Sequence, residues 1–184
     1  MWTDIKSNRE VMAEFIKKEK PKVIAEIGVW KSRLVKSLLR SCGDIITQYW
    51  AIDSWQPFNY DNEFEPDMDR YVKTTSDGWE NAYLYACKLM YYFPQLHIIK
   101  TSSIKASKLF PLDFFDLVFI DADHRYRGIL SDIKTWLPLI RKNGFLSGHD
   151  YKHSHPGVIK AVNETFFSED VKIVKDSSVW ITRI

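Results

Sequence analysis

The sequence predicts an α/β protein with a doubly wound, mostly parallel sheet of seven strands, helices on both faces and an antiparallel hairpin at the C-terminus. Two observations support this class. Short apolar runs alternate with segments of helical periodicity along most of the 184 residues, and three of these runs end in an acidic residue. The last two runs flank a short polar segment, as the strands of a hairpin do.

The N-terminal half begins with a helix expected at residues 4–18, where apolar residues recur at helical spacing and Asp4 or Ser7 can cap it. Pro21 ends this helix, because proline cannot continue one. The next expected elements are a strand at 22–28, a helix at 32–39, a strand at 45–53, a helix at 79–93, a strand at 97–100 and a short helix at 104–109. This alternation is typical of a parallel sheet.

The C-terminal half contains four consecutive apolar residues, Leu117–Ile120, which predict a strand buried on both faces. A strongly periodic helix follows at 126–140, with Ile140 as the last residue of its core face and Pro138 tightening or kinking its final turn. The remaining elements are a strand at 144–148, a helix at 157–167 and an antiparallel pair at 171–174 and 179–182.

Residues 54–79 interrupt the alternation and mix aromatic with acidic side chains. We expect an irregular, lid-like insertion here, within one domain that spans residues 1–184, because the chain has the length of a single domain. The aromatic side chains of the insertion either line a ligand pocket or fill a small local core, and the sequence leaves both interpretations open.

The charge balance argues against binding to polyanions. The chain has 26 basic and 24 acidic residues and a net charge of +2, so neither nucleic acid nor an anionic membrane is an expected partner. Two cysteines without metal-type spacing fit a reducing compartment. The N-terminus lacks the apolar core of a signal peptide, and no run is long enough to span a bilayer. We therefore expect a soluble, cytoplasmic protein.

Three acids stand where expected strands end, namely Glu26, Asp53 and Asp121, and we expect them to point into one crevice at the carboxyl edge of the sheet. Gly28 follows Glu26 at a strand-to-helix turn, where a ligand can approach the backbone. The dinucleotide fingerprint G-x-G-x-x-G is absent, because Trp30 stands at its second glycine. Gly28 is therefore either a cofactor glycine or an ordinary turn glycine.

Four of the five histidines lie between positions 124 and 155, beside the ends of two expected neighbouring strands. If these strands are parallel, Asp121, His124, His149 and Asp150 meet at one edge of the sheet. Such a group can hold a divalent ion and move a proton. The alternative is that Asp121 caps the next helix and that the histidines are ordinary surface residues.

Four motifs together resemble those of the class I S-adenosylmethionine-dependent methyltransferases, which have a Rossmann-like fold. These motifs are Glu26-x-Gly28, Ala51–Trp55, Phe119–Tyr126, and Gly144–Tyr151 with Gly157-Val158 after it. More narrowly, they are similar to a small family that includes the macrolide-sugar O-methyltransferases and relatives from cephalosporin biosynthesis. The resemblance covers residues 22–167.

The resemblance implies that S-adenosylmethionine is the cofactor. The residues implied to bind it are Glu26, Gly28, Asp53, Trp55, Ser102, Ser103 and Asp121. Glu26 and Gly28 match the motif under the methionine part and the ribose, and Asp53 matches the acid that binds the ribose. Trp55 is expected to flank the adenine, and Ser102 or Ser103 to contact its edge.

The resemblance also implies a divalent metal, magnesium or manganese, at Asp121, His149 and Asp150. His149 stands where better-known members have a carboxylate, and a nitrogen donor makes manganese, iron and zinc fit as well. His124 matches the general base, so His124 and Asp121 are the expected catalytic residues.

The expected function is that of an O-methyltransferase that acts, with the help of a divalent metal, on a hydroxyl of a small molecule, sugar or glycan. The alternative is a non-catalytic S-adenosylmethionine- or nucleotide-binding module with the same fold. Self-association into a homo-oligomer is left open by the sequence.

Overall fold

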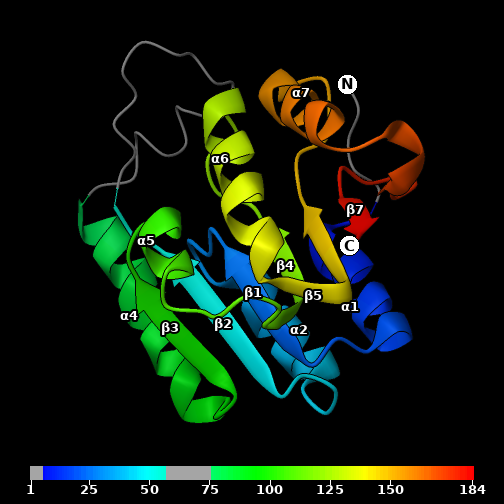
Figure 1. The fold of residues 1–184 in the computed structure, drawn as a ribbon. Coiled ribbons are helices and arrows are strands. Elements are labelled where there is room, and N and C mark those ends of the chain that lie inside the picture. The colour runs from blue at the N-terminus through cyan, green and yellow to red at the C-terminus, as the bar shows by residue number, and fades with distance from the viewer. Residues whose placement is uncertain (1–5, 57–75) are drawn as a thin grey trace.

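The structure is a computed structural model that describes residues 6–56 and 76–184. In this part of the chain a seven-stranded sheet has the order β3-β2-β1-β4-β5-β7-β6 (Figure 1). The strands are β1 (Val23–Ile27), β2 (Gln48–Asp53), β3 (Leu96–Lys100), β4 (Phe115–Ile120), β5 (Ile140–Gly148), β6 (Val171–Ile173) and β7 (Trp180–Arg183). The pairs from β3 to β5 are parallel, whereas β7 runs antiparallel to both β5 and β6. The predicted fold class is confirmed.

Helices cover both faces of the sheet (Figure 1). They are α1 (Asn8–Glu19), α2 (Arg33–Cys42), α4 (Ser76–Tyr92), α5 (Ser103–Ser107), α6 (Tyr126–Trp136) and α7 (Pro156–Thr165). Buried residues of α1, α2 and α4 share one core, and those of α5, α6 and α7 share the other. Consecutive residues of β4 alternate between the two cores, Leu117 in the first and Val118 in the second, which explains its continuous apolar run.

The N-terminal cap of α1 is Ser7, whose side chain accepts a hydrogen bond from the Glu10 amide while the Glu10 carboxylate accepts one from the Ser7 amide. The alternative cap, Asp4, lies outside the described residues. So does most of the expected lid-like insertion, of which only residues 54–56 and 76–79 are described.

The helix predicted at 126–140 is shorter than expected. It ends at Trp136, a single 3₁₀ turn follows at Leu137–Leu139, and Ile140 already belongs to β5, where it pairs with Phe115. Pro138 explains the early end, because it has no amide hydrogen for the helical ladder. Ile140 is therefore a buried strand residue and not part of the helix core face.

The strand register brings the candidate site residues to one edge. Ile27 of β1 is level with Ile52 of β2 and Ile120 of β4, and Gly148 of β5 is level with Ile120. The residues that follow these strand ends therefore emerge side by side from the sheet. This level placement is what the acidic strand ends in the sequence predict.

Among the described helices, none combines the length and the apolar character needed to cross a bilayer. Cys42 is buried and Cys87 is half-buried, and both are free thiols.

Asp116 joins three parts of the sheet from a nearly buried position in β4. Its Oδ2 accepts hydrogen bonds from the amides of Lys22 and Val23, at 2.6 and 3.0 Å, where the chain enters β1. Its Oδ1 lies 2.5 Å from Nε of Arg141 in β5. The ladder between β4 and β5 shifts register at this point, between Phe115 and Leu117. One carboxylate thus satisfies two backbone amides where the chain enters β1 and also pairs with a side chain of β5.

We predict that Asp116→Ala lowers the free energy of unfolding by about 2–4 kcal/mol, because two amides and a guanidinium lose a charged acceptor. Urea unfolding monitored by circular dichroism measures this change. Asp44→Ala, at an exposed turn position, is the matched control and should change the free energy by less than about 0.5 kcal/mol. Equal stability of the two variants would contradict the role of Asp116.

Candidate functional site

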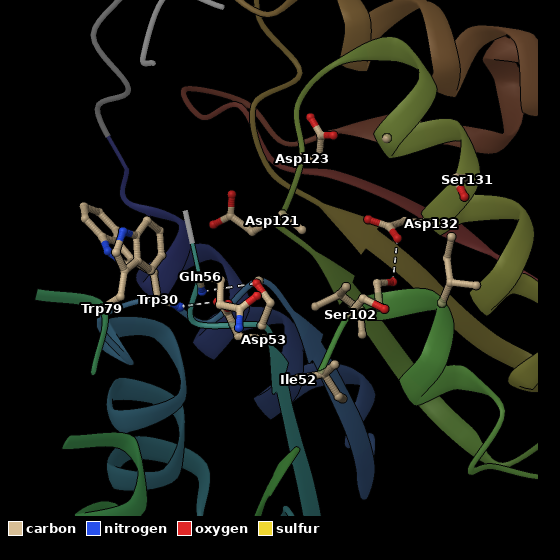
Figure 2. Close-up of a pocket in the computed structure, with 17 residues that line it drawn as sticks. Trp30, Ile52, Asp53, Gln56, Trp79, Ser102, Asp121, Asp123, Ser131 and Asp132 are labelled. Atoms are coloured by element: carbon tan, nitrogen blue, oxygen red, sulfur yellow. Dashed lines mark hydrogen bonds between the residues drawn. The ribbon is translucent and has the colours of Figure 1, made fainter. Parts of the chain in front are cut away.

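A cavity of about 370 Å³ lies at the carboxyl ends of β1, β2 and β4, between the turn after β1 and helices α5 and α6 (Figure 2). Its volume is within the range of small-molecule sites. The polar and aromatic residues that line it are Trp30, Asp53, Ser54, Gln56, Trp79, Ser102, Ser103, Asp121, Asp123, Ser131 and Asp132. Five of the seven residues expected to bind a cofactor are therefore in its wall, with Gly28 as the fifth.

Gly28 is required by the close packing of two strand ends. A Cβ at this position would lie 2.3 Å from the carbonyl oxygen of Asp121, and the backbone has φ +90°. Trp30 and Ser32 also have positive φ values, +42° and +57°. Trp30 thus adopts, at some cost, the left-handed backbone that a glycine adopts readily. Gly28 is at once a turn glycine and part of the cavity wall.

Asp53 closes the turn after β1. Its Oδ2 accepts hydrogen bonds from the amides of Val29 and Trp30, both at 2.8 Å, and its Oδ1 accepts one from the amide of Trp55 at 2.7 Å. Burial raises the pKa of Asp53, and these backbone amides oppose that rise. The Ser54 amide also acts on this carboxylate, so a ligand that binds Asp53 would share its oxygens with the surrounding backbone.

Glu26 departs from the expectation that three acids share one crevice. It is buried in β1, does not line the cavity and accepts a hydrogen bond from the Tyr49 hydroxyl at 2.6 Å. The register explains this, since Glu26 is level with Ala51 and Phe119 and lies inside the sheet, before the ends of β1, β2 and β4. Burial raises the pKa of Glu26 well above its usual range.

Trp55 also lies elsewhere than expected. It is buried against Tyr83 of α4, and its indole nitrogen donates to the carbonyl oxygen of Trp30 at 3.0 Å. The aromatic side chains in the cavity wall are instead Trp30 and Trp79, with ring centroids 6.4 Å apart (Figure 2). In the sequence, Trp30 is notable only because it replaces the second glycine of the fingerprint. A large aromatic residue at an expected turn is the sequence signal for its place in the cavity wall.

Ser102 and Ser103 form the opposite wall, as the sequence predicts, together with Asp132 of α6, which it does not predict. The Ser103 hydroxyl donates to Asp132 at 2.5 Å and accepts from the indole nitrogen of Trp136 at 2.8 Å. Burial raises the pKa of Asp132 to about 6. An acid within the apolar stripe between Ile129 and Trp136 is the sequence signal that identifies this residue.

A cluster of acids and histidines adjoins the cavity at Asp121. Nε2 of His124 lies 3.4 Å from Oδ1 of Asp121 and 3.1 Å from Oδ2 of Asp150. Nδ1 of His149 lies 3.7 Å from Oδ1 of Asp121 and 3.3 Å from Oδ1 of Asp150. The four residues that were expected to meet at one edge do meet there. Lys152 adds an ammonium 2.7 Å from Oδ1 of Asp150.

The cluster attracts positive charge. Burial alone would lower the pKa of His149, but Asp121 and Asp150 outweigh it and raise that pKa to about 9. For His124 the same two acids outweigh burial and raise its pKa. Burial alone would raise the pKa of Asp150, but the neighbouring histidines and Lys152 hold it well below its usual range.

A family model described as a methyltransferase domain matches residues 25–151, more than half of the chain. The chain belongs to the methyltransferase domain family. Like the other class I enzymes, this methyltransferase depends on S-adenosylmethionine.

Solved structures show the same fold as this methyltransferase. The O-methyltransferase NovP has a TM-score of 0.67 and 19% identity, over 96% of this chain and 77% of NovP. The methyltransferase PaMTH1 of Podospora anserina, bound to SAH, has a TM-score of 0.62 and 16% identity, over 98% of this chain and 80% of PaMTH1. A search of curated proteins found no significant match.

Two sets of side chains in the methyltransferase could hold a metal ion, within the described residues. Asp121, His149 and Asp150 place one donor atom each within 4.8 Å of one another, and so do His124, Asp150 and His155. In the first set Ser178 lies 3.1 Å from Nε2 of His149, the ring nitrogen that faces away from the acids. Protein metal sites commonly orient a histidine ligand by such a second hydrogen bond. The donor chemistry of the first set therefore fits a divalent cation.

We predict that Asp132→Asn removes a pH dependence from the stability of the methyltransferase. The folded pKa of about 6 exceeds the value of 3.8 expected on unfolding, so stability falls as pH rises from about 4 to 6 and stays reduced above that. The Asn variant should match the wild type near pH 4 and exceed it at pH 7 by roughly 2–3 kcal/mol.

Urea unfolding at pH 4, 5, 6 and 7 measures this difference. Asp113→Asn, at an exposed position with positive φ, is the control and should leave the pH profile of the wild type unchanged. A parallel profile for Asp132→Asn and wild type would show that Asp132 does not titrate in this range.

Proposed function

We propose that this methyltransferase transfers the methyl group of S-adenosylmethionine to a hydroxyl of a small molecule or sugar, with the help of a divalent cation, magnesium or manganese. The cation would lie at Asp121, His149 and Asp150, and His124 would be the general base. The alternative of a non-catalytic binding module is less favoured, because the chain belongs to an enzyme family.

The observation that carries this proposal is the double position of Asp121. It lines the cavity, and its Oδ1 also lies within 3.7 Å of ring nitrogens of both His124 and His149. One end of a cofactor in the cavity would therefore lie next to the cluster of acids and histidines. Transfer of a methyl group needs this proximity, because the acceptor oxygen must lie in line with the methyl carbon.

The cavity offers partners for each part of the cofactor. Asp53 lies beside the Gly28 turn, where its carboxylate would accept from ribose hydroxyls, and Ser102 or Ser103 lies where an adenine edge would reach the opposite wall. Trp30 and Trp79 provide aromatic surface on the side of the turn. Glu26 is buried behind the cavity wall, where it accepts a hydrogen bond from Tyr49.

In the proposed reaction the acceptor oxygen attacks the methyl carbon, the carbon–sulfur bond breaks, and its electron pair stays on sulfur to give S-adenosylhomocysteine. The acceptor proton passes to the neutral His124 ring. Asp121 and Asp150 lie 3.4 and 3.1 Å from its Nε2 and stabilise the charged form of the ring after proton transfer. The same two contacts raise the pKa of His124 and make it a stronger base.

A bound divalent cation would supply Lewis acidity that lowers the pKa of the acceptor hydroxyl. The residues that would hold it are Asp121, Asp150 and His149. Oxygen ligands from two carboxylates suit magnesium, and the nitrogen of His149 suits manganese better. NovP, which has a similar structure, is an O-methyltransferase. This similarity favours a hydroxyl acceptor over a carbon or nitrogen acceptor.

We predict that Asp53→Ala weakens the binding of S-adenosylmethionine by about 1–3 kcal/mol, because charged hydrogen bonds to the ribose are lost. Calorimetric titration with S-adenosylmethionine and S-adenosylhomocysteine measures this change. Asp53→Asn keeps one acceptor oxygen for the turn and should weaken binding less. Unchanged affinity in a folded Asp53→Ala variant would place the ribose elsewhere.

We predict that Asp121→Asn binds S-adenosylmethionine within about twofold of the wild type but loses at least tenfold in manganese affinity and about a hundredfold in turnover. Titration calorimetry with each ligand, and a methyl-transfer assay across sugar and phenol acceptors, measure these quantities. Asp113→Asn is the exposed control. Full turnover by Asp121→Asn with an acceptor that the wild type methylates would refute the cation-and-base mechanism.

A further inference from the structure

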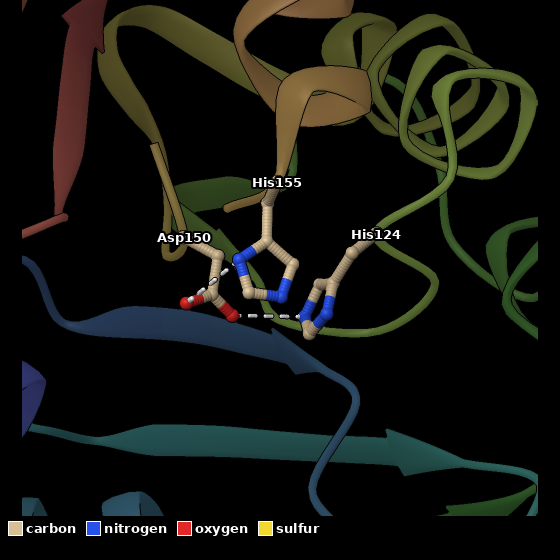
Figure 3. Close-up of side chains that lie close together, drawn as sticks. All are labelled: His124, Asp150 and His155. Atoms are coloured by element: carbon tan, nitrogen blue, oxygen red, sulfur yellow. Dashed lines mark ion pairs between the residues drawn. The ribbon is translucent and has the colours of Figure 1, made fainter. Parts of the chain in front are cut away.

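Figure 3 shows the second set of donors, His124, Asp150 and His155. It has Asp150 in common with the set of Asp121, His149 and Asp150. Nε2 of His124 lies 3.1 Å from Oδ2 of Asp150, and Nδ1 of His155 lies 3.9 Å from Oδ1. The two imidazole rings meet edge to face, with centroids 4.9 Å apart. Their donor atoms converge on the space around one carboxylate.

The fold holds His155 firmly at this place. Its side chain is only 1% exposed, and the residue caps α7. The first turn of α7 packs directly on the chain that carries His124, since a Cβ on Gly157 would lie 2.7 Å from the His124 carbonyl oxygen. Gly157 therefore permits the contact that brings His155 against His124. The arrangement is built by the packing of α7 and not by a chance approach of surface side chains.

The chemistry of this set differs from that of the first. It offers two imidazole nitrogens and one carboxylate, and such a combination favours transition metals over magnesium, which prefers oxygen ligands. Side-chain rotations can bring donors within 4.8 Å of one another onto an ion with bonds of about 2.0–2.2 Å. Lys152 and His155 both approach Oδ1 of Asp150, at 2.7 and 3.9 Å, whereas His124 approaches Oδ2 at 3.1 Å. A cation bound by this set would therefore take the place of the Lys152 ammonium beside Oδ1, or bind at Oδ2.

We propose that His124, Asp150 and His155 form a second cation site that takes a divalent transition metal of the zinc or cobalt(II) class. This second site goes beyond the proposed function, because neither the site nor its test requires methyl transfer. One consequence does rest on that function. Occupation would make Nε2 of His124 a metal ligand, so that it could no longer accept a proton from the acceptor.

The test isolates this site in the full chain carrying Asp121→Asn and His149→Asn, which remove two ligands of the first set and leave all three of the second. Cobalt(II) is the probe, because histidine ligands give it visible absorption bands. In this background we expect cobalt(II) to bind with a stoichiometry of one. Adding His155→Asn should weaken that binding at least tenfold. Adding His153→Asn, at an exposed position of the same loop, should leave it unchanged.

Absence of cobalt(II) binding in the double variant would overturn the proposal, and so would binding that His155→Asn leaves intact. His155→Gln, with circular dichroism and thermal unfolding of each variant, separates loss of a ligand from loss of the fold. The result is independent of the proposed reaction. If Asp121→Asn kept full turnover but His155→Asn abolished cobalt(II) binding, the cation-and-base mechanism would fail and this site would stand.

Discussion

The close approach of the turn after β1 to the end of β4 is the constraint on which the site depends. At Gly28 the two chains are too close for any side chain, since a Cβ would overlap the Asp121 carbonyl. This packing sets the floor of the cavity and fixes the direction in which the chain leaves β4. Asp121 consequently faces the cavity on one side and the histidines on the other.

Carboxylates carry much of the remaining organisation, and each performs a different task because its surroundings differ. Asp116 joins the start of β1 to β4 and β5 from within the sheet. Asp53 accepts hydrogen bonds from two amides of the turn after β1 and from the amide of Trp55. Asp132 is buried in the opposite wall and accepts a hydrogen bond from Ser103. Asp150 is surrounded by cationic or protonatable partners. Burial raises the pKa values of Asp53 and Asp132, whereas neighbouring positive charge lowers that of Asp150.

The fold could be predicted from the sequence because apolar runs and acidic strand ends are local signals. The cluster of Asp121, His124, His149 and Asp150 was predictable for the same reason, since parallel neighbours place their ends together. Glu26 and Trp55 were misplaced because their directions depend on strand register and on a left-handed backbone, both of which are set by tertiary packing. Pro138 ended a helix whose periodicity continued through it. Asp132 was missed as a site residue because only the packing of α6 brings it there.

The contact between Ser178 and His149 ties the reaction centre to the C-terminal hairpin. The Ser178 hydroxyl lies 3.1 Å from His149, and its carbonyl oxygen accepts the Tyr151 amide at 3.0 Å. Ser178 lies two residues before β7, which pairs with β5 in the antiparallel direction. The described residues that line the cavity lie between positions 27 and 132, whereas the contact that steadies His149 comes from this later hairpin. The cavity and the orientation of its neighbouring histidine are thus set by different parts of the chain, and a change in the hairpin can affect one without the other.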